Sequence, residues 1–292
     1  MSKALPRTIS AAALSSALVG ASIIGAAPAQ AIADGRNAVS SSALSSFGSS
    51  SPLVRLQIGS TACTGTLITP TWILTARHCI PESGNAGAAI GSSTLSSFEA
   101  VRQAIIHPTA DLALVELYTP NNSVTADIYA SHVQAGNAGT TEGWGGYAIQ
   151  NQQIAQAADV SVQRRVNNLE GPDPSAILLE GQISNGRLMP GDSGGPLFVN
   201  GQLAGVLSMS TAVEGAASQA GTVGWYVPVA EYADWISRYS GKSIPAITGA
   251  PAPLVDATAL PTFIPQARIQ NIPSTGIATL DGFIRSWAAG SA

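Results

Sequence analysis

The chain has 292 residues, of which 45% are hydrophobic and 10% are charged, enough for one large domain or two small ones. Lysine occurs only at Lys3 and Lys242, and this scarcity argues against a nucleic-acid-binding protein, which would carry clustered basic residues. The formal net charge is −4, and it becomes −6 without the leader described next, since 11 basic residues then face 17 acidic ones. An acidic surface of this size favours solubility rather than anionic partners.

Residues 1–31 have the pattern of a secretory signal peptide. Lys3 and Arg7 precede an uncharged run over 8–31 that closes with Ala29-Gln30-Ala31, a small-residue cleavage site. The run is almost long enough to span a bilayer, so an N-terminal membrane anchor is the alternative. Two glycines and a proline inside it disfavour that alternative. We expect a secreted, extracellular protein with no stable membrane insertion after cleavage.

Two cysteines, Cys63 and Cys79, remain in the exported chain. An even number in an oxidising compartment predicts one disulfide, which for a loop of this length stabilises the fold by roughly 3 kcal/mol in the chain-entropy model. The cysteines and the three histidines show none of the paired spacings typical of metal ligands. We therefore expect no metal site.

Short apolar runs separated by turn residues follow a Ser-rich segment over 40–51. Val54, Leu56 and Ile58 alternate with polar residues, as in a half-buried strand. Further runs lie at 67–68, 72–74, 112–117, 160–162, 176–179, 197–199 and 203–207. Asn200-Gly201 between the last two predicts a type I′ hairpin. Many short strands without β-α alternation indicate an all-β sandwich or barrel.

One helix is expected, and it closes the globular part of the chain after Pro228. Its apolar face consists of Val229, Tyr232, Ala233, Ile236 and Tyr239. Beyond Gly241 repeated prolines break any helix. Residues 242–292 therefore form either an extended strap on the domain or a partly disordered extension.

Ser193 lies in the most informative stretch, Gly191-Asp192-Ser193-Gly194-Gly195. A serine flanked by glycines can lie on a tight turn whose backbone N–H groups point at one spot, as acyl transfer requires. The same residues match the nucleophile elbow of α/β-hydrolases, in which the histidine follows the serine. All three histidines here precede Ser193, which excludes that arrangement.

A serine nucleophile needs a base, and His78 is the candidate. It directly precedes Cys79, so the predicted disulfide would fix the backbone that carries the imidazole. His107 and His132 lie in loop-like sequence without such an anchor, and we interpret them as structural or exposed.

Residue spacing alone does not identify the carboxylate that orients the base. Asp111 opens the apolar run 112–117, where an acid must be hydrogen-bonded to offset the cost of burial. On composition alone, Asp127 and Asp159 remain alternatives.

These motifs together resemble the trypsin/chymotrypsin family of serine endopeptidases, in the order His, Asp, Ser. The matching segments are Thr66-Leu67-Ile68, Leu74-Thr75-Ala76-Arg77-His78-Cys79, His107-Pro108, Asp111-Leu112-Ala113-Leu114, Gly143-Trp144-Gly145, Gly191 to Leu197, Gly224-Trp225-Tyr226 and Trp235-Ile236. The resemblance implies an all-β peptidase domain over 32–241 with two packed antiparallel six-stranded β-barrels. The first barrel covers about 50–125 and the second about 126–228; a C-terminal helix covers about 229–240, and the Pro-rich tail follows.

The resemblance also implies a mechanism. His78, Asp111 and Ser193 form the catalytic triad, and the backbone N–H groups of Gly191 and Ser193 form the oxyanion hole. The expected function is that of a secreted serine endopeptidase that hydrolyses protein or peptide substrates through an acyl-enzyme. It needs no cofactor, and we expect a monomer.

Asp192 has a separate role by the same resemblance, because the family pairs this acid with a freed N-terminal amine. Ile32 follows the leader directly and begins a segment similar to the family's mature start, although Ala33 and Asp34 depart from the pattern. Signal cleavage itself would then create the activating terminus. The alternative is an isoleucine at this boundary by chance.

The substrate pocket is the least determined part of the site. An ungapped count from Ser193 puts Arg187 at the pocket floor, where it could favour acidic side chains or instead face solvent. Ser208 and Ser210 correspond to the wall that pairs with the substrate backbone. Two other functions use the same scaffold: a non-catalytic binding protein or adhesin, and an esterase.

Overall fold

The computed structural model describes residues 32–38, 51–81, 84–93, 97–145, 154–167, 177–211 and 221–256. The predicted leader, most of the Ser-rich segment and the tail beyond Asp256 lie outside these residues. Among the described residues, no helix is long and apolar enough to cross a membrane.

The first barrel closes from six antiparallel strands in the order β2-β3-β4-β7-β6-β5. The strands are β2 (Leu53–Ile58), β3 (Thr61–Thr69), β4 (Trp72–Thr75), β5 (Ala86–Ile90), β6 (Ser97–Ile106) and β7 (Ala113–Leu117). In β2 the side chains of Val54, Leu56 and Ile58 are buried whereas Gln57 is exposed. The alternation predicted for this segment is therefore confirmed.

The second barrel closes in the order β8-β9-β10-β13-β12-β11, because β11 and β9 both pair with β8. Its strands are β8 (Ala138–Gly143), β9 (Gln156–Asn167), β10 (Leu178–Ser184), β11 (Pro196–Val199), β12 (Gln202–Ser210) and β13 (Val223–Pro228). Asn200 and Gly201 connect β11 to β12 with φ of 51° and 75°. Positive φ at both positions is what a type I′ turn requires, and the predicted hairpin is confirmed.

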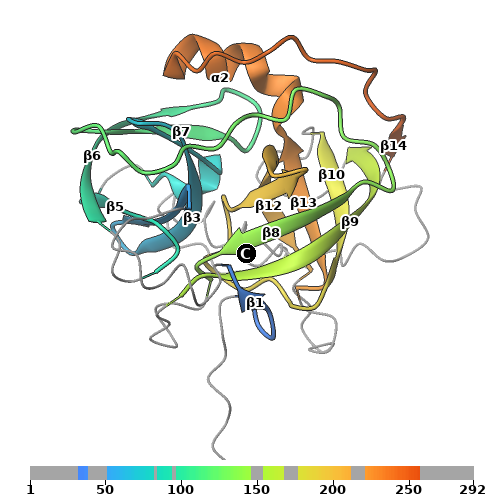
Figure 1. Ribbon diagram of the computed structural model, residues 1–292, viewed down its shortest axis with the longest axis horizontal. Helices are drawn as coiled ribbons and strands as arrows, with labels where there is room; N and C mark the ends of the chain where they lie inside the picture. The colour runs from blue at the N-terminus through green and yellow to red at the C-terminus, as the bar shows by residue number, and fades with distance from the viewer. Residues whose placement is uncertain are drawn as a thin grey trace, which may run out of the picture.

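The two ends of β9, where it extends beyond β10 and β8, pair with two further strands. The short strand β1 (Arg36–Asn37) pairs with β9 in antiparallel fashion, and β14 (Leu254–Asp256) pairs with it in parallel. Figure 1 shows both beside the second barrel, with β1 at its lower end and β14 at its far edge. Segments near both ends of the described part of the chain thus pair with the second barrel.

The predicted closing helix divides into two pieces. A 3-10 turn, η3 (Val229–Tyr232), leads into α2 (Ala233–Ser240), which ends at Gly241 with φ 70°. From there the chain crosses to β14 (Figure 1), and Lys242 Nζ donates a hydrogen bond to Ala126 O at 3.0 Å. The described part of the Pro-rich tail is an extended strap on the domain.

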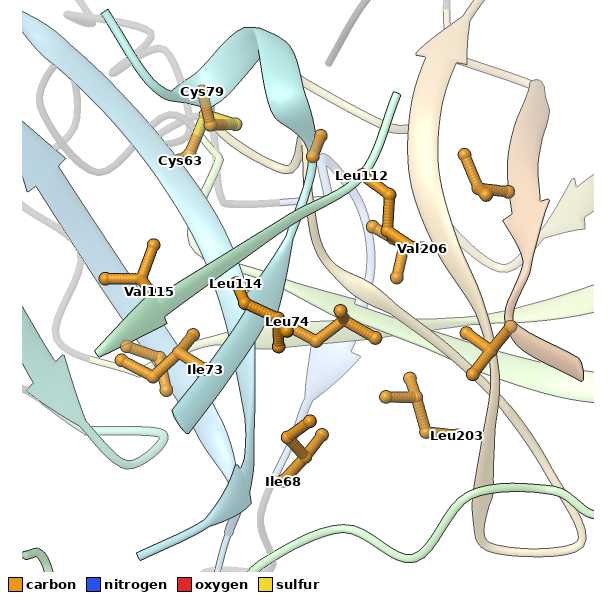
Figure 2. Close-up of a cluster of buried hydrophobic side chains, with 14 of the residues drawn as sticks. Cys63, Ile68, Ile73, Leu74, Cys79, Leu112, Leu114, Val115, Leu203 and Val206 are labelled. Atoms are coloured by element: carbon orange, nitrogen blue, oxygen red, sulfur yellow. A yellow bond between two sulfur atoms is a disulfide. The ribbon is translucent and has the colours of Figure 1, made fainter. Parts of the chain in front are cut away.

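Within the described residues, one large hydrophobic cluster spans both barrels. It contains Ile68, Leu74 and Leu114 from the first barrel and Leu203 and Val206 from the second, and Figure 2 shows these side chains converging between the sheets. Burial of such side chains supplies the main stabilising free energy. It also fixes the relative placement of the loops that each barrel contributes to the site between them.

Candidate active site

His78 lies in a short 3-10 turn, η2 (Arg77–Cys79), which follows β4 directly. The disulfide predicted between Cys63 and Cys79 is present and ties this turn to β3, with the two Cα atoms 6.1 Å apart (Figure 2). The imidazole is therefore held on a crosslinked backbone, and only 4% of its side chain is exposed.

Asp111 binds His78 at two points. Its Oδ1 accepts a hydrogen bond from the His78 backbone N–H at 2.9 Å, and its Oδ2 lies 2.8 Å from His78 Nδ1. Ser208 Oγ donates to the same Oδ2 at 2.6 Å. The structure thus selects Asp111 among the three acids considered, since Asp127 pairs with Lys242 and Asp159 pairs with Arg36.

The contacts of Asp111 keep it ionised. Burial raises the pKa of its carboxyl, but the charge of His78 and the hydrogen bonds from His78 and Ser208 outweigh burial, and the pKa lies below its ordinary value. A carboxylate at Oδ2 requires a proton on His78 Nδ1, which leaves Nε2 as the basic nitrogen. His78 Nε2 is buried and has no hydrogen-bond partner within the described residues.

Ser193 lies on a turn between two glycines with positive φ, Gly191 at 102° and Gly194 at 79°. The first barrel holds this turn: Thr64 N–H donates to Ser193 O at 2.8 Å, and Thr64 Oγ donates to Gly191 O at 2.8 Å. Within the described residues, no backbone carbonyl accepts from the N–H of Gly191 or of Ser193. Two unpaired donors on one turn are what an oxyanion needs.

The turn that carries His78 contacts the backbone of Ser193 through the neighbouring Cys79. Cys79 Sγ, one residue from His78, lies 3.7 Å from Ser193 O. The side chains make no hydrogen bond here, because Nε2 has no partner. Catalytic hydrogen bonds are often long in unliganded enzymes and shorten when substrate binds.

Asp192 is as buried as Asp111 but has only N–H donors. Gly145 N donates to Oδ1 and Met189 N to Oδ2, each at 2.7 Å, and the backbone of Ile32 donates a third hydrogen bond. Burial outweighs these bonds and raises the pKa of Asp192 to about 6. The structure therefore places the Ile32 backbone beside Asp192, and the activation pair stays a prediction.

The three predicted pocket residues have different surroundings. Arg187 pairs with Asp34 at 3.2 Å, and its backbone N–H donates to Ala33 O, so it contacts the N-terminal segment. Ser208 directs its hydroxyl to Asp111, and Ser210 is buried at the end of β12. The predicted place of Arg187 and Ser210 in the substrate pocket stays a prediction.

Sequence reasoning missed two residues of the site. Thr64 bridges the barrels, because its Oγ also accepts from Trp144 N at 2.9 Å. Ser208 was assigned to the substrate wall and not to the orientation of Asp111. For Thr64 the position next to Cys63 was the available signal; nothing in the local sequence around Ser208 indicates its partner.

One group of potential metal ligands occurs in the described part of the chain: Cys63, His78 and Cys79, whose ligand atoms lie within 4.8 Å of one another. Both sulfurs belong to the disulfide, and a metal requires a thiolate. With the disulfide intact, this group cannot act as a metal site.

The chain belongs to the trypsin family, whose family model matches residues 44–236. An uncharacterized peptidase of Corynebacterium glutamicum strain R is 60% identical over 271 residues, covering 93% of this chain and 92% of the relative. Trypsin I-P1 of Gallus gallus is 30% identical over 205 residues, 63% of this chain and 81% of its own. The solved structure of mouse neuropsin, a serine protease, superposes with a TM-score of 0.56 at 22% identity and covers 70% of this chain and 98% of neuropsin. The predicted trypsin-like fold is confirmed.

Proposed function

We propose that this protein is a secreted serine endopeptidase that hydrolyses peptide bonds through an acyl-enzyme. One observation carries the proposal: His78 Nδ1 lies 2.8 Å from a buried carboxylate of Asp111, while Nε2 is buried and has no partner among the described residues. An imidazole held in this tautomer is a general base that lacks only its proton donor. The trypsin-family membership supports a protein or peptide as the substrate.

In the proposed first step Ser193 Oγ attacks the peptide carbonyl carbon and its proton passes to His78 Nε2. The carbonyl oxygen becomes an oxyanion, which accepts hydrogen bonds from the N–H groups of Gly191 and Ser193. Asp111 stabilises the imidazolium through the contact at Nδ1.

In the second step the C–N bond breaks and His78 returns the proton to the departing amine, which leaves an ester on Ser193. A water molecule then attacks the ester carbonyl and gives its proton to His78 Nε2. When the C–Oγ bond breaks, His78 protonates Ser193 and the free carboxylic acid is released.

The test is labelling with a fluorophosphonate combined with casein cleavage. Wild type should be labelled at Ser193, and Ser193→Ala should lose proteolysis by roughly 10⁶-fold while it remains folded. Ser184→Ala, at an exposed position of β10, is the matched control and should keep full activity. Proteolysis that survives in Ser193→Ala would overturn the proposal, and wild type that is neither labelled nor active would indicate a binding protein.

We further propose that signal cleavage after Ala31 activates the enzyme. Ile32 is fully buried, its backbone donates to Asp192, and its φ is 41°. Positive φ is strained for a β-branched residue; this strain arises from the preceding carbonyl, which cleavage removes. The new ammonium would then face the Asp192 carboxylate. N-terminal sequencing of active secreted enzyme tests this, and a start downstream of Ile32 would contradict it.

A further inference from the structure

A cavity of about 820 Å³ lies apart from the proposed catalytic residues, where the two barrels and the N-terminal segment meet. Its wall comes from β1, the two residues before β2, the connection between the barrels, β8, Ala157 of β9 and the hairpin between β11 and β12. None of His78, Asp111 and Ser193 lines it. Ligand sites in proteins commonly have this volume and lie at junctions between domains.

The shape of the cavity follows from strand register. Ala157 on β9 is paired with Arg36 on one side and with Glu142 on the other, and all three line the cavity. Residues directly opposite one another in neighbouring antiparallel strands lie on the same face of the sheet. The small alanine between two long side chains therefore leaves a hollow with a cation on one side and a carboxyl group on the other.

Strand alternation places Glu142 in this hollow. In β8 Thr141 and Gly143 are buried, whereas Ala138, Thr140 and Glu142 lie on the opposite face and line the cavity. Within the described residues no hydrogen bond to the Glu142 carboxyl is found, and the residue is partly exposed. A partly buried carboxyl that faces a cavity and is bonded to no described residue is available to a ligand.

The charges around Glu142 are few. The positive charge of Arg36 on β1 lowers the pKa of Glu142, but its guanidinium forms an ion pair with Asp159 of β9 at 2.7 Å. Asp127, on the connection between the barrels, is paired with Lys242 and is largely exposed. The hairpin side contributes Phe198 and uncharged polar residues. Burial of Glu142 is the dominant influence and raises its pKa to about 7, against a smaller opposite effect of Arg36.

We propose that this cavity binds a small organic cation, a primary ammonium on an apolar body, with the Glu142 carboxylate as the counter-ion. The ammonium supplies the hydrogen-bond donors that the carboxylate lacks, and Phe198, Pro52 and Val124 offer apolar surface to the body of the ligand. A bound cation favours the ionised carboxyl, so it lowers the pKa of Glu142. The affinity for the ammonium ligand therefore rises as pH increases through the pKa that Glu142 has in the empty cavity.

The test uses isothermal titration calorimetry on the Ser193→Ala protein, so that binding is measured without turnover and independently of the proposed peptidase activity. The probe is 2-phenylethylamine, and its neutral counterpart is 2-phenylethanol. We expect the amine to bind with Kd of about 1 mM or below at about pH 8, and at least about tenfold more tightly than the alcohol. Between about pH 8 and about pH 6 the ionised fraction of Glu142 falls about tenfold, and the amine affinity should fall with it.

Substitutions locate the bound amine. Glu142→Gln should weaken amine binding at least about tenfold and leave the alcohol unchanged, whereas Asp234→Asn, the loss of one exposed carboxylate on α2, should change it less than about twofold. Thr140→Trp, which fills the cavity beside an intact Glu142, should also abolish binding. Melting curves confirm that each variant is folded. Equal amine binding by Glu142→Gln and the parent protein, or loss in Asp127→Asn instead, would overturn the proposal.

Discussion

Asp111 and Asp192 are two aspartates on either side of the same site, both almost completely buried, and their surroundings shift their pKa values in opposite directions. Burial raises both, but the imidazole of His78 and the Ser208 hydroxyl bring the pKa of Asp111 below its ordinary value. Asp192 receives only backbone N–H groups, which leave its pKa at about 6. Three backbone N–H dipoles leave the pKa of Asp192 raised, whereas the contacts of His78 and Ser208 lower that of Asp111. In the proposed mechanism Asp111 must stay ionised. Asp192 gains a charged partner only when cleavage frees the ammonium of Ile32.

The largest effect should come from removing the charge at the first of these acids. Asp111→Asn keeps the volume but presents an amide that can donate to His78 Nδ1, so the imidazole takes the wrong tautomer for a base. We expect kcat to fall by about 10⁴-fold with little change in KM. The measurement is steady-state hydrolysis of a peptide ester and a peptide amide at neutral pH.

Asp127→Asn is the control for this change, because sequence alone left Asp127 as an alternative and its side chain is 77% exposed. It should retain activity within about twofold. If Asp111→Asn kept more than about a tenth of wild-type kcat, Asp111 would not be the orienting acid.

The sequence predicts those features of the site that depend on short segments of chain, but not the contacts between distant segments. The Ser193 turn, the β2 strand and the Cys63–Cys79 pair follow from local patterns, since glycine spacing, alternation and cysteine count are properties of short segments. The hydrogen bond from Ser208 to Asp111 joins residues 97 positions apart. The bulge that shifts the β12–β13 register between Leu207 and Met209 breaks the simple alternation at Ser208, and no local pattern encodes that shift.

Long-range placement also explains Arg187. Its ungapped position before Ser193 suggested the pocket floor, but the backbone bridge to Ala33 and the ion pair with Asp34 depend on where the N-terminal segment docks. The cavity beside Glu142 could not be predicted from the sequence either, because it results from the pairing of three strands, β1, β9 and β8, that are distant in sequence.

The second prediction concerns Asp192 and compares a chain that starts at Ile32 with one that keeps Ala31. In the longer chain the folded pKa of Asp192 is raised to about 6. Its contribution to stability is therefore complete below the unfolded pKa near 4 and is lost as pH rises through 6. In the chain that starts at Ile32 the ammonium stabilises the carboxylate and opposes this loss.

Urea unfolding across this pH range measures the difference. The free energies of unfolding of the two chains should separate between about pH 4 and about pH 7, with the Ile32 chain more stable by on the order of 3 kcal/mol at the upper end. Curves that stay parallel would mean that Ile32 does not supply a cation to Asp192.

The smallest effect should come from Ser208→Ala, which removes one of the three hydrogen bonds to Asp111 and leaves His78 in place. A hydrogen bond to a charged group contributes roughly 1.5–3 kcal/mol to stability. Part of that loss should appear in kcat, which we expect to fall about three- to tenfold.

Because the hydroxyl helps to lower the pKa of Asp111, its removal should also move the acidic limb of the stability profile toward higher pH. Ser210→Ala removes a buried hydroxyl of the same strand for which no contact to Asp111 is found among the described residues, and it should leave this limb unchanged. A shift of equal size in both variants would show that strand packing, and not the bond to Asp111, accounts for the effect.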